Sequence, residues 1–381
     1  MEELELLEVL ARGEDSRRQF KVDVINETSL AREMVAFGNS GGGELFIGVK
    51  DNGEVAGLTG QDIGRLNQLV SNAASQQVRP PINPQTENIS VSGMLVMRIT
   101  VPDGVSKPYM DKDGAIWVKS GADKRKATSR EEMQRLFQQA GLVHGDEIPV
   151  SGSSIADLDR DYFREFLRKN FPNAPAAPLP RRLENLNLMK DGVFNVSGAL
   201  LFAADPNRRL PAFIVKAVAF PGKSIQKDHY LDSRDITGKL SDIFQQSSGF
   251  VAGNLHHVQG ERGINSVGEP EIPRIVLEEL IVNALIHRDY FISAPVQIRV
   301  FTDRIEIISP GHLPNNLTVE NVRSGVSNMR NPNLASHATR LLPYRGIGTG
   351  IIGALQEYPS IDFEDDREGN RFVATIRRGN D

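Results

Sequence analysis

Hydrophobic and polar positions along the first part of the chain predict a mixture of helices and strands. Leucines and a valine recur at helical spacing over residues 4–10, and a second apolar face follows over residues 30–37. Alternating or β-branched runs predict strands at Arg17 to Val24, Glu44 to Val49, Leu95 to Val101 and Ile116 to Lys119. A polar helix is expected near residues 61–76. Residues 1–141 are therefore predicted to form a mixed α/β domain.

The middle of the chain is bounded by segments rich in Gly, Ser and Pro, at residues 145–154 and 172–180, which predict linkers. Further elements are expected in a connector over residues 155–265: a charged helix at 157–169, an apolar strand or helix at 196–203, strands at 210–220 and 225–230, and a long helix at 236–255. A small winged-helix-like element is an option here. The adjacent pair His256 and His257 is a poor metal site, because adjacent side chains on a helix diverge.

Polar residues interrupt an apolar helix predicted around Glu278 to Tyr290. Glu279 and Asn283 lie four residues apart and therefore share one helical face. A carboxylate that orients water, one turn from an amide oxygen that coordinates Mg²⁺, suits a nucleoside-triphosphate site. The alternative is a helix with two satisfied polar residues.

The segments after this helix favour the nucleotide hypothesis. Strands are predicted at residues 295–301 and 304–308, and the second strand runs into Ser309, Pro310 and Gly311. The string RGIGTG at residues 345–350 precedes a helical run over residues 351–358. Such a glycine loop can present backbone N–H groups to phosphate, although it is also compatible with a simple helix-entry turn.

In this order, the segments resemble the ATP-binding domains of gyrases and histidine kinases. NALIHRDY, DRIEIISPGHLP, MRNPNL and GIGTGI are similar to the divergent version in RecG-like, Schlafen-linked proteins, over roughly residues 270–378. The resemblance implies a two-layer α/β sandwich in which Glu279 activates water and Asn283 holds Mg²⁺ beside ATP. It also implies that other residues bind the nucleotide: His287, Arg288, Asp289, Gly346, Gly348 and Gly350.

One position departs from the wider ATPase class. That class places an Asp before its first glycine turn to read the adenine amino group, whereas this chain has Ser309 before Pro310 and Gly311. A serine hydroxyl can contact a base through water, but it cannot make the same charge-assisted hydrogen bond. ATP binding is therefore expected more firmly than ATP hydrolysis.

The N-terminal segment resembles the Schlafen-type AlbA-like domain, which is described as DNA-binding. FGNSGGGELFIGVKDNGEVAGL and IWVKSGADKRKATSREEMQRLF carry the resemblance. Nuclease members of that family have a three-carboxylate site, and the corresponding positions here are Glu14, Gln19 and Asp51. A neutral amide at Gln19 weakens metal binding and cannot act as a base, so nuclease activity is an alternative that this residue opposes.

Basic residues provide a second reason to expect nucleic acid. If the two basic clusters meet on one face, they make a phosphate-binding surface, on which Trp117 or Tyr109 could stack with bases. Solvated lysines and a core tryptophan are the alternative. The candidate residues are Arg17, Arg18, Lys21, Lys119, Lys124, Arg125 and Lys126.

Composition sets limits on the class of protein. The chain has 381 residues, of which 39% are hydrophobic and 24% charged, and its formal net charge is −5. The absence of cysteine excludes disulfides, thiolate zinc sites and cysteine nucleophiles. No apolar stretch approaches the length of a membrane span, and the acidic start lacks a signal-peptide pattern, so a cytoplasmic protein without a membrane partner is expected.

Together these patterns predict an α/β (α+β) protein with domains at residues 1–141, 155–265 and 270–378. We interpret it as a nucleic-acid-binding transcriptional regulator or defence factor, with DNA favoured over RNA, whose ATP-binding domain controls assembly or DNA affinity. A homo-oligomer is expected. The alternatives are a metal-dependent RNase or DNase regulated by ATP, and a protein-interaction scaffold in which both sites have decayed.

Overall fold

The chain forms two compact units, Met1–Val143 and His144–Asp381. The computed structural model describes residues 2–173, 175, 177–225, 229–258, 269–314, 317–346 and 348–379. The predicted first domain, residues 1–141, ends close to the boundary between the units. The other two predicted domains fall within the second unit, where their apolar residues share one core.

A four-stranded sheet with the order β1-β2-β5-β4 forms the centre of the first unit. Its strands are β1 (Arg18–Lys21), β2 (Gly43–Ile47), β4 (Gln85–Val91) and β5 (Met94–Val101). β1 and β2 are parallel, whereas β2, β5 and β4 pair antiparallel. The parallel pair requires a crossover connection, which α2 (Glu27–Asn39) provides.

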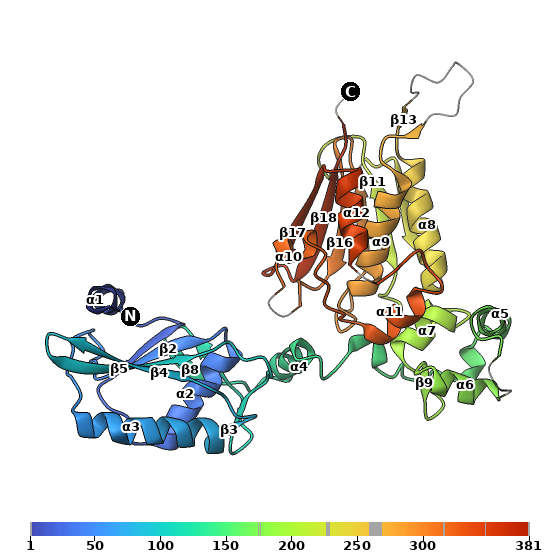
Figure 1. Ribbon diagram of the computed structural model, residues 1–381. Coiled ribbons are helices and arrows are strands. Elements are labelled where there is room, and N and C mark those ends of the chain that lie inside the picture. The colour runs from blue at the N-terminus through green and yellow to red at the C-terminus, as the bar shows by residue number, and fades with distance from the viewer. Residues whose placement is uncertain are drawn as a thin grey trace. The chain divides into compact units, whose positions relative to one another are not determined.

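Helices cover both faces of this sheet (Figure 1). Successive side chains of a strand point to opposite faces, so Leu45 and Ile47 share a core with α2 and α3 (Gly60–Asn72). Phe46, between them, packs with α1 (Glu3–Ala11). The sequence favours these helix starts, because Asn26 accepts a hydrogen bond at the start of α2 and Thr59 forms a capping box at the start of α3.

Smaller elements complete the first unit. A π-helical turn, Ala73–Gln77, extends α3, and α4 (Arg130–Gln139) lies near the end of the unit. The two-stranded pairs are β3 (Val78–Arg79) with β6 (Met110–Asp111), and β7 (Trp117–Ser120) with β8 (Asp123–Lys126). The strands predicted at residues 17–24, 44–49, 95–101 and 116–119 are confirmed, with slightly different bounds.

A six-stranded sheet with the order β12-β11-β15-β16-β18-β17 forms the second unit (Figure 1). β11 and β15 are parallel, and all other neighbours are antiparallel. Two strands from the predicted connector, β11 and β12, therefore continue the sheet of the C-terminal strands. The strands are β11 (Val215–Ala219), β12 (Asp232–Ile236), β15 (Val296–Val300), β16 (Arg304–Pro310), β17 (Ile361–Asp366) and β18 (Arg371–Arg377).

Three helices pack beside one another over this sheet: α8 (Leu240–Gly253), α9 (Arg274–His287) and α12 (Thr349–Glu357) (Figure 1). α9 lies between the other two and contacts β16. It is apolar around most of its circumference, as expected for a helix inside a core. Its polar residues Glu279 and Asn283 are only partly buried.

The remaining elements of the second unit surround this core. α5 (Arg160–Asn170), α6 (Leu179–Asn185) and α7 (Val196–Phe202) precede the sheet. α10 (Val319–Arg323) and α11 (Pro332–Ala338) lie between β16 and α12 in the chain. The short strands are β9 (Met189–Lys190) with β10 (Val193–Phe194), and β13 (His257–Val258) with β14 (Glu269–Pro270). Single 3₁₀ turns occur at Gly145–Glu147, Ile155–Asp157 and Pro206–Arg208.

Several connector predictions need correction. Of the segment predicted as a strand or helix at 196–203, residues 196–202 form α7, so the strand option was wrong. The long helix predicted over residues 236–255 starts only at Leu240, because Ile236 ends β12 and Gly238 has a φ of 116°, which favours glycine. Of the strand predicted at 225–230, residues 226–228 lie outside the described residues. The winged-helix-like element stays a prediction.

The helices of the described residues are short. The longest apolar helices, α8 and α9, have 14 residues each. Among the described residues, none has the combined length and apolar character that a membrane crossing requires.

Candidate functional site

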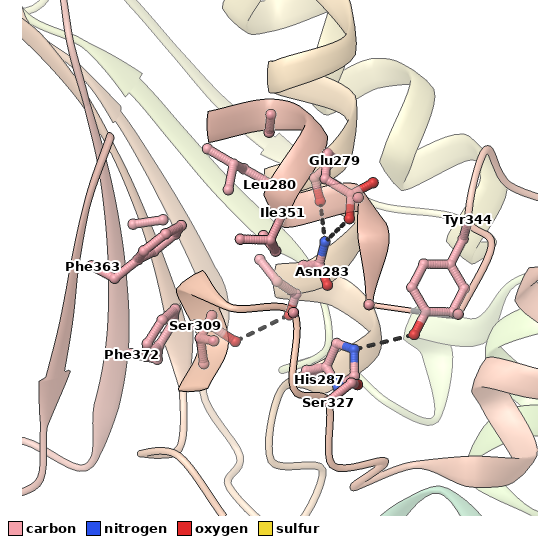
Figure 2. Close-up of a pocket in the computed structure, with 18 of the residues that line it drawn as sticks. Glu279, Leu280, Asn283, His287, Ser309, Ser327, Tyr344, Ile351, Phe363 and Phe372 are labelled. Carbon is pink, nitrogen blue, oxygen red and sulfur yellow. Dashed lines mark hydrogen bonds between the residues drawn. The ribbon is translucent and has the colours of Figure 1, made fainter. Parts of the chain in front are cut away.

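A cavity of about 650 Å³ lies in the second unit. Its volume is in the range of small-molecule binding sites. α9, β16, β18 and the start of α12 supply lining residues, together with the segments before and after α11 (Figure 2). This cavity brings together most of the residues that the sequence predicts for a nucleotide site.

Glu279 and Asn283 face each other across one turn of α9 (Figure 2). The Asn283 Nδ2 donates to the Glu279 backbone carbonyl at 2.7 Å and to Glu279 Oε1 at 2.6 Å. Burial raises the pKa of Glu279, and the hydrogen bond from Asn283 partly opposes that increase. Because the Asn283 amide nitrogen is engaged, its amide oxygen is the atom that can coordinate a cation.

Gly350, in the first turn of α12, packs directly on Glu279. A Cβ atom at Gly350 would overlap the Glu279 carboxylate. A glycine at this position therefore leaves room for the Glu279 carboxylate beside α12. The resemblance predicts a phosphate-lining role for Gly350, and the structure shows in addition that Gly350 determines where the Glu279 carboxylate can lie.

The other two glycines of the loop also line the cavity. Gly346 and Gly348 have φ angles of 71° and 73°, in the left-handed region. A Cβ at Gly348 would overlap the carbonyl oxygen of Gly325, which follows α10. The glycine loop is thus in close backbone contact with the segment after α10.

One end of the cavity is apolar. Phe363 of β17 and Phe372 of β18 line it, and Ser309 lies beside them at the end of β16 (Figure 2). Ser309 Oγ donates to the backbone carbonyl of Ala284 at 3.0 Å. Its proton is therefore used within the protein, so Ser309 can only accept a hydrogen bond from a ligand in this arrangement. Gly311 follows at the cavity wall.

The other end of the cavity is polar. His287 Nε2 lies 3.2 Å from the hydroxyl of Tyr344 (Figure 2). Burial, with a smaller effect of the Arg330 charge, lowers the pKa of His287 to about 4. Burial and the charge of Glu279 raise the pKa of Tyr344 to about 12. Both groups are therefore neutral near pH 7 and act as hydrogen-bonding groups.

Arg288 and Asp289 are exceptions to the predicted site, because neither lines the cavity. Arg288 is 2% exposed and donates to the carbonyls of Ile292 and Ala294, at 3.0 and 2.6 Å. Asp289 accepts a hydrogen bond from the backbone of Phe291 at 2.9 Å. They stabilise the turn after α9, so the predicted nucleotide contacts are not supported.

Sequence reasoning missed several cavity residues, among them Arg330, Tyr344, Arg345, Phe363 and Phe372. Arg330 and Arg345 lie inside the quoted motifs MRNPNL and RGIGTG, but nothing in the spacing of these motifs shows which side chains point inward. Asn331 of the same motif has a structural role: its side chain donates to the carbonyls of Ile286 and Arg288 at the end of α9, both at 2.8 Å.

The three positions of the predicted nuclease site differ in their surroundings. Glu14 Oε1 accepts from the backbone N–H of Phe20 at 2.7 Å. Gln19 is 6% exposed and accepts from Lys119 Nζ at 3.3 Å, whereas Asp51 lies in an exposed turn after β2. Within the described ranges, no group of three or more His, Asp or Glu side chains could hold a metal ion.

The Gln19–Lys119 hydrogen bond brings β1 and the β7–β8 hairpin together, as the prediction of one basic face requires. Several of the predicted cations are paired: Arg18 with Asp15, Lys124 with Glu33, and Arg125 with Glu132. Lys119 lies over the Phe37 ring, and burial lowers its pKa. Among the described residues, the candidates without an ion-pair partner are Arg17, Lys21, Lys119 and Lys126.

The aromatic residues proposed for base stacking are engaged inside the first unit. Tyr109 is buried in the core. Trp117 Nε1 donates to Asp111 at 2.8 Å, and the Arg32 guanidinium lies 5.1 Å from the Trp117 ring centroid. Tyr109 is therefore a core residue, as the alternative predicted. The ring of Trp117 already has the Arg32 guanidinium as an intramolecular partner.

The fold and the two sites define a two-unit α/β protein in which a cationic face and a nucleotide-sized cavity lie in separate units. Family comparisons match a part of each unit: residues 14–128 match the family described as "Schlafen, AlbA_2", and residues 293–376 match "Putative ATP-dependent DNA helicase recG C-terminal". The N-terminal part of the chain is therefore similar to the Schlafen AlbA_2 family and the C-terminal part to the RecG C-terminal family, which confirms the predicted resemblance. The second match begins after α9 and does not include Glu279 or Asn283.

Two solved structures are similar to this chain. The DIP2311 protein from Corynebacterium diphtheriae is 22% identical, with a TM-score of 0.49, and the comparison covers 99% of this chain and 80% of that chain. The N-terminal domain of a "Putative ATP-dependent DNA Helicase RecG-related Protein" from Nitrosomonas europaea is 23% identical, with a TM-score of 0.25. That comparison covers 34% of this chain and 96% of that chain. No curated protein matches the sequence.

Proposed function

We propose that this protein is a nucleotide-responsive DNA-binding protein, acting in the cytoplasm as a homo-oligomeric transcriptional regulator or defence factor. Its second unit binds ATP with Mg²⁺, and its first unit binds DNA. Nucleotide occupancy controls assembly or DNA affinity. The two family matches support a nucleic-acid-related protein with an ATP-binding domain, and the finer role is our inference from the sites.

The arrangement of Glu279, Asn283 and Gly350 in one cavity is the observation that carries the ATP proposal. The Asn283 amide oxygen would hold Mg²⁺, and the backbone of the glycine loop would hold phosphate. The apolar end beside Phe363 and Phe372 suits a nucleobase. The metal ion would neutralise phosphate charge when bound.

The face that includes β1 and the β7–β8 hairpin supports the DNA part of the proposal. Side chains two residues apart on a strand share a face, so Lys21 projects on the same side as Gln19, and Arg17 directly precedes the strand. Gln19 contacts Lys119, and Lys126 lies two residues from Lys124 on the opposite strand. Cations without an ion-pair partner among the described residues therefore lie at β1 and on the β7–β8 hairpin that contacts it, where they can bind phosphates.

Calorimetric titration of ATP with Mg²⁺ into the wild type and Asn283→Ala tests the nucleotide site. We expect saturable binding to the wild type and a loss of affinity of at least about tenfold in Asn283→Ala, because the amide that orients Glu279 and faces the cation is removed. Asn185→Ala, at an exposed position of α6, is the matched control and should bind as the wild type does. Absence of binding to the wild type would contradict the proposal.

Fluorescence anisotropy of labelled duplex DNA, with and without saturating ATP, tests the coupling. We expect ATP to change the DNA affinity by roughly 5- to 100-fold, and DNA to change the ATP affinity by the same factor, because linkage is reciprocal. Equal DNA affinity in both conditions would show that the units act independently.

The alternatives make different predictions. A metal-dependent nuclease would cut nucleic acid with Mg²⁺ or Mn²⁺ and lose this activity in Asp51→Asn. The neutral Gln19 and the engagement of Glu14 by the Phe20 backbone do not favour that alternative. A scaffold with decayed sites would bind neither nucleotide nor nucleic acid.

A further inference from the structure

The two ends of the cavity differ, so a nucleotide would bind in one orientation. In Figure 2, Phe363 and Phe372 lie on one side of Asn283, and Tyr344 lies on the other side. A nucleotide with its base at the aromatic end and its metal-binding phosphates near Asn283 would therefore extend its phosphate chain toward Tyr344. Arg345 follows Tyr344 directly in the chain and also lines the cavity.

The arginines of the cavity wall differ in how they are held. Arg330 donates to the His312 carbonyl at 2.6 Å, and the charges of Asp289 and Asp365 act on it, so its position is fixed by the protein. Arg345 is exposed, and within the described part of the chain its side chain has no ion-pair or hydrogen-bond partner. No lysine among the described residues lines the cavity.

Carboxylates on the cavity wall repel a phosphate chain, so phosphate binding there requires a nearby cation. Glu279 lies against Gly350, and Glu278 is already paired with Arg274 at 2.6 Å. An entering phosphate chain would be repelled by the Glu279 charge. α12 begins at Gly348 without a side-chain cap and without an acidic residue in its first turn, so its backbone N–H groups can receive an anion beside Arg345.

We propose that Arg345 binds the terminal phosphate of the nucleotide and makes the cavity selective for a nucleoside triphosphate over the diphosphate. This inference rests on the proposed ATP site. A guanidinium group makes two parallel hydrogen bonds to a phosphate, which an ammonium group cannot reproduce. The terminal phosphate of ATP reaches this end of the cavity, whereas ADP ends short of it and leaves Arg345 in solvent.

Titration of Mg–ATP and Mg–ADP into the full chain and its Arg345→Ala and Arg345→Lys variants tests the role of Arg345. We expect Arg345→Ala to lower the ATP affinity by about tenfold or more and the ADP affinity by less than about threefold, with Arg345→Lys in between. Arg181→Ala is the matched control, because Arg181 is an exposed arginine on α6, without an ion-pair partner among the described residues. The readout is binding, so it does not depend on hydrolysis.

The outcomes separate this inference from the ATP proposal. If the wild type binds ATP and Arg345→Ala binds ATP equally well, Arg345 has no phosphate role, although the ATP site stands. Equal losses for ATP and ADP would also overturn triphosphate selectivity. If the wild type binds neither nucleotide, the ATP proposal itself fails. Thermal unfolding of each variant shows whether the fold is intact.

Discussion

At the scale of single residues, the candidate site depends on the contact between Gly350 and Glu279. The Glu279 carboxylate lies between two neighbours: Asn283 donates a hydrogen bond to its Oε1, and Gly350 of α12 packs against it. Glu279 is also a flexible side chain, so a larger residue at position 350 would move the carboxylate and not the helix. The position of Glu279 can therefore be changed without unfolding the unit.

Gly350→Ala should separate binding from stability. We expect the added methyl group to push Glu279 away from Asn283, with a large change in ATP affinity, while the helix propensity of Ala limits the loss of stability to within about 1 kcal/mol. Gly249→Ala in α8, where no atom lies within 4 Å of the new Cβ, is the control and should be neutral or stabilising. Calorimetry and urea unfolding measure the two effects. Unchanged ATP binding in Gly350→Ala would contradict this account.

The positions of site residues could be predicted where their spacing in the sequence alone determines which side chains lie together. The four-residue separation of Glu279 and Asn283 puts both on one helical face in any helix. The inward direction of Tyr344 and Arg345 was not predictable, because loops have no periodicity. Adjacent residues of the motif HRDY also have different surroundings: His287 lines the cavity, whereas Arg288 is buried at the turn after α9. Ion pairing of Lys124 with Glu33 depends on residues far apart in sequence.

At the scale of elements, Asp146 connects three of them. It lies in the 3₁₀ turn Gly145–Glu147, is fully buried, and its Oδ2 accepts from Leu334 N of α11 at 2.7 Å and from Ser197 of α7 at 3.3 Å. Among the described residues its Oδ1 has no hydrogen-bond partner. Burial raises the pKa of Asp146 from 3.8 to about 6; Glu147 adds to this increase, whereas the Leu334 N–H, His144 and Ser197 oppose it.

This pKa predicts a pH-dependent stability. Because the folded pKa lies above the unfolded value, protonation favours the folded state; the stabilisation is complete below pH 3.8 and is lost as pH rises through about 6. Relative to Asp146→Asn, the wild type should gain about 1 kcal/mol of unfolding free energy between pH 7.5 and pH 5. The comparison with Asp146→Asn is required because the lowered pKa of His287 has the opposite effect.

Urea unfolding of both proteins at the two pH values measures this difference. Fluorescence of Trp117 reports the first unit, so circular dichroism is needed for the second unit. A difference between wild type and Asp146→Asn that is the same at pH 7.5 and pH 5 would show that Asp146 does not titrate in this range.

Element positions were predictable to different degrees. Strands rich in apolar and β-branched residues, such as β5 and β16, were found from the sequence. The start of α8 was not, because Ile236, which fits a helical pattern with Leu240, belongs to β12, and the break at Gly238 depends on backbone conformation. The pairing of β11 with β15 joins residues about 80 positions apart, and sequence periodicity carries no information on such partners.

At the scale of the whole molecule, the net charge of −5 does not describe the surface that we propose for DNA binding. Many cations are neutralised inside the first unit, but among the described residues Arg17, Lys21, Lys119 and Lys126, at β1 and the β7–β8 hairpin, have no ion-pair partner. An acidic chain can therefore bind a polyanion through a local face. Its affinity should depend strongly on salt.

The combined variant Arg17→Ala, Lys21→Ala and Lys126→Ala tests this face. We expect weaker DNA binding, and a plot of log affinity against log salt whose slope is smaller by about 2 to 3, since each lost phosphate contact removes about 0.9. Arg181→Ala, in the second unit, is the control. Anisotropy titrations between low and moderate salt give both slopes. An unchanged slope would place the DNA elsewhere.

The parallel pairing of β11 with β15 has a practical consequence for anyone who divides this chain. The segment matched to the RecG C-terminal family, residues 293–376, begins at β15 and lacks β11, β12 and α9. Cut out at those limits, it would expose the unpaired edge of β15 and the apolar face that α9 covers, and such edges promote aggregation. Limits set by sequence similarity mark shared ancestry, whereas the hydrogen bonds between strands mark the smallest piece that can fold.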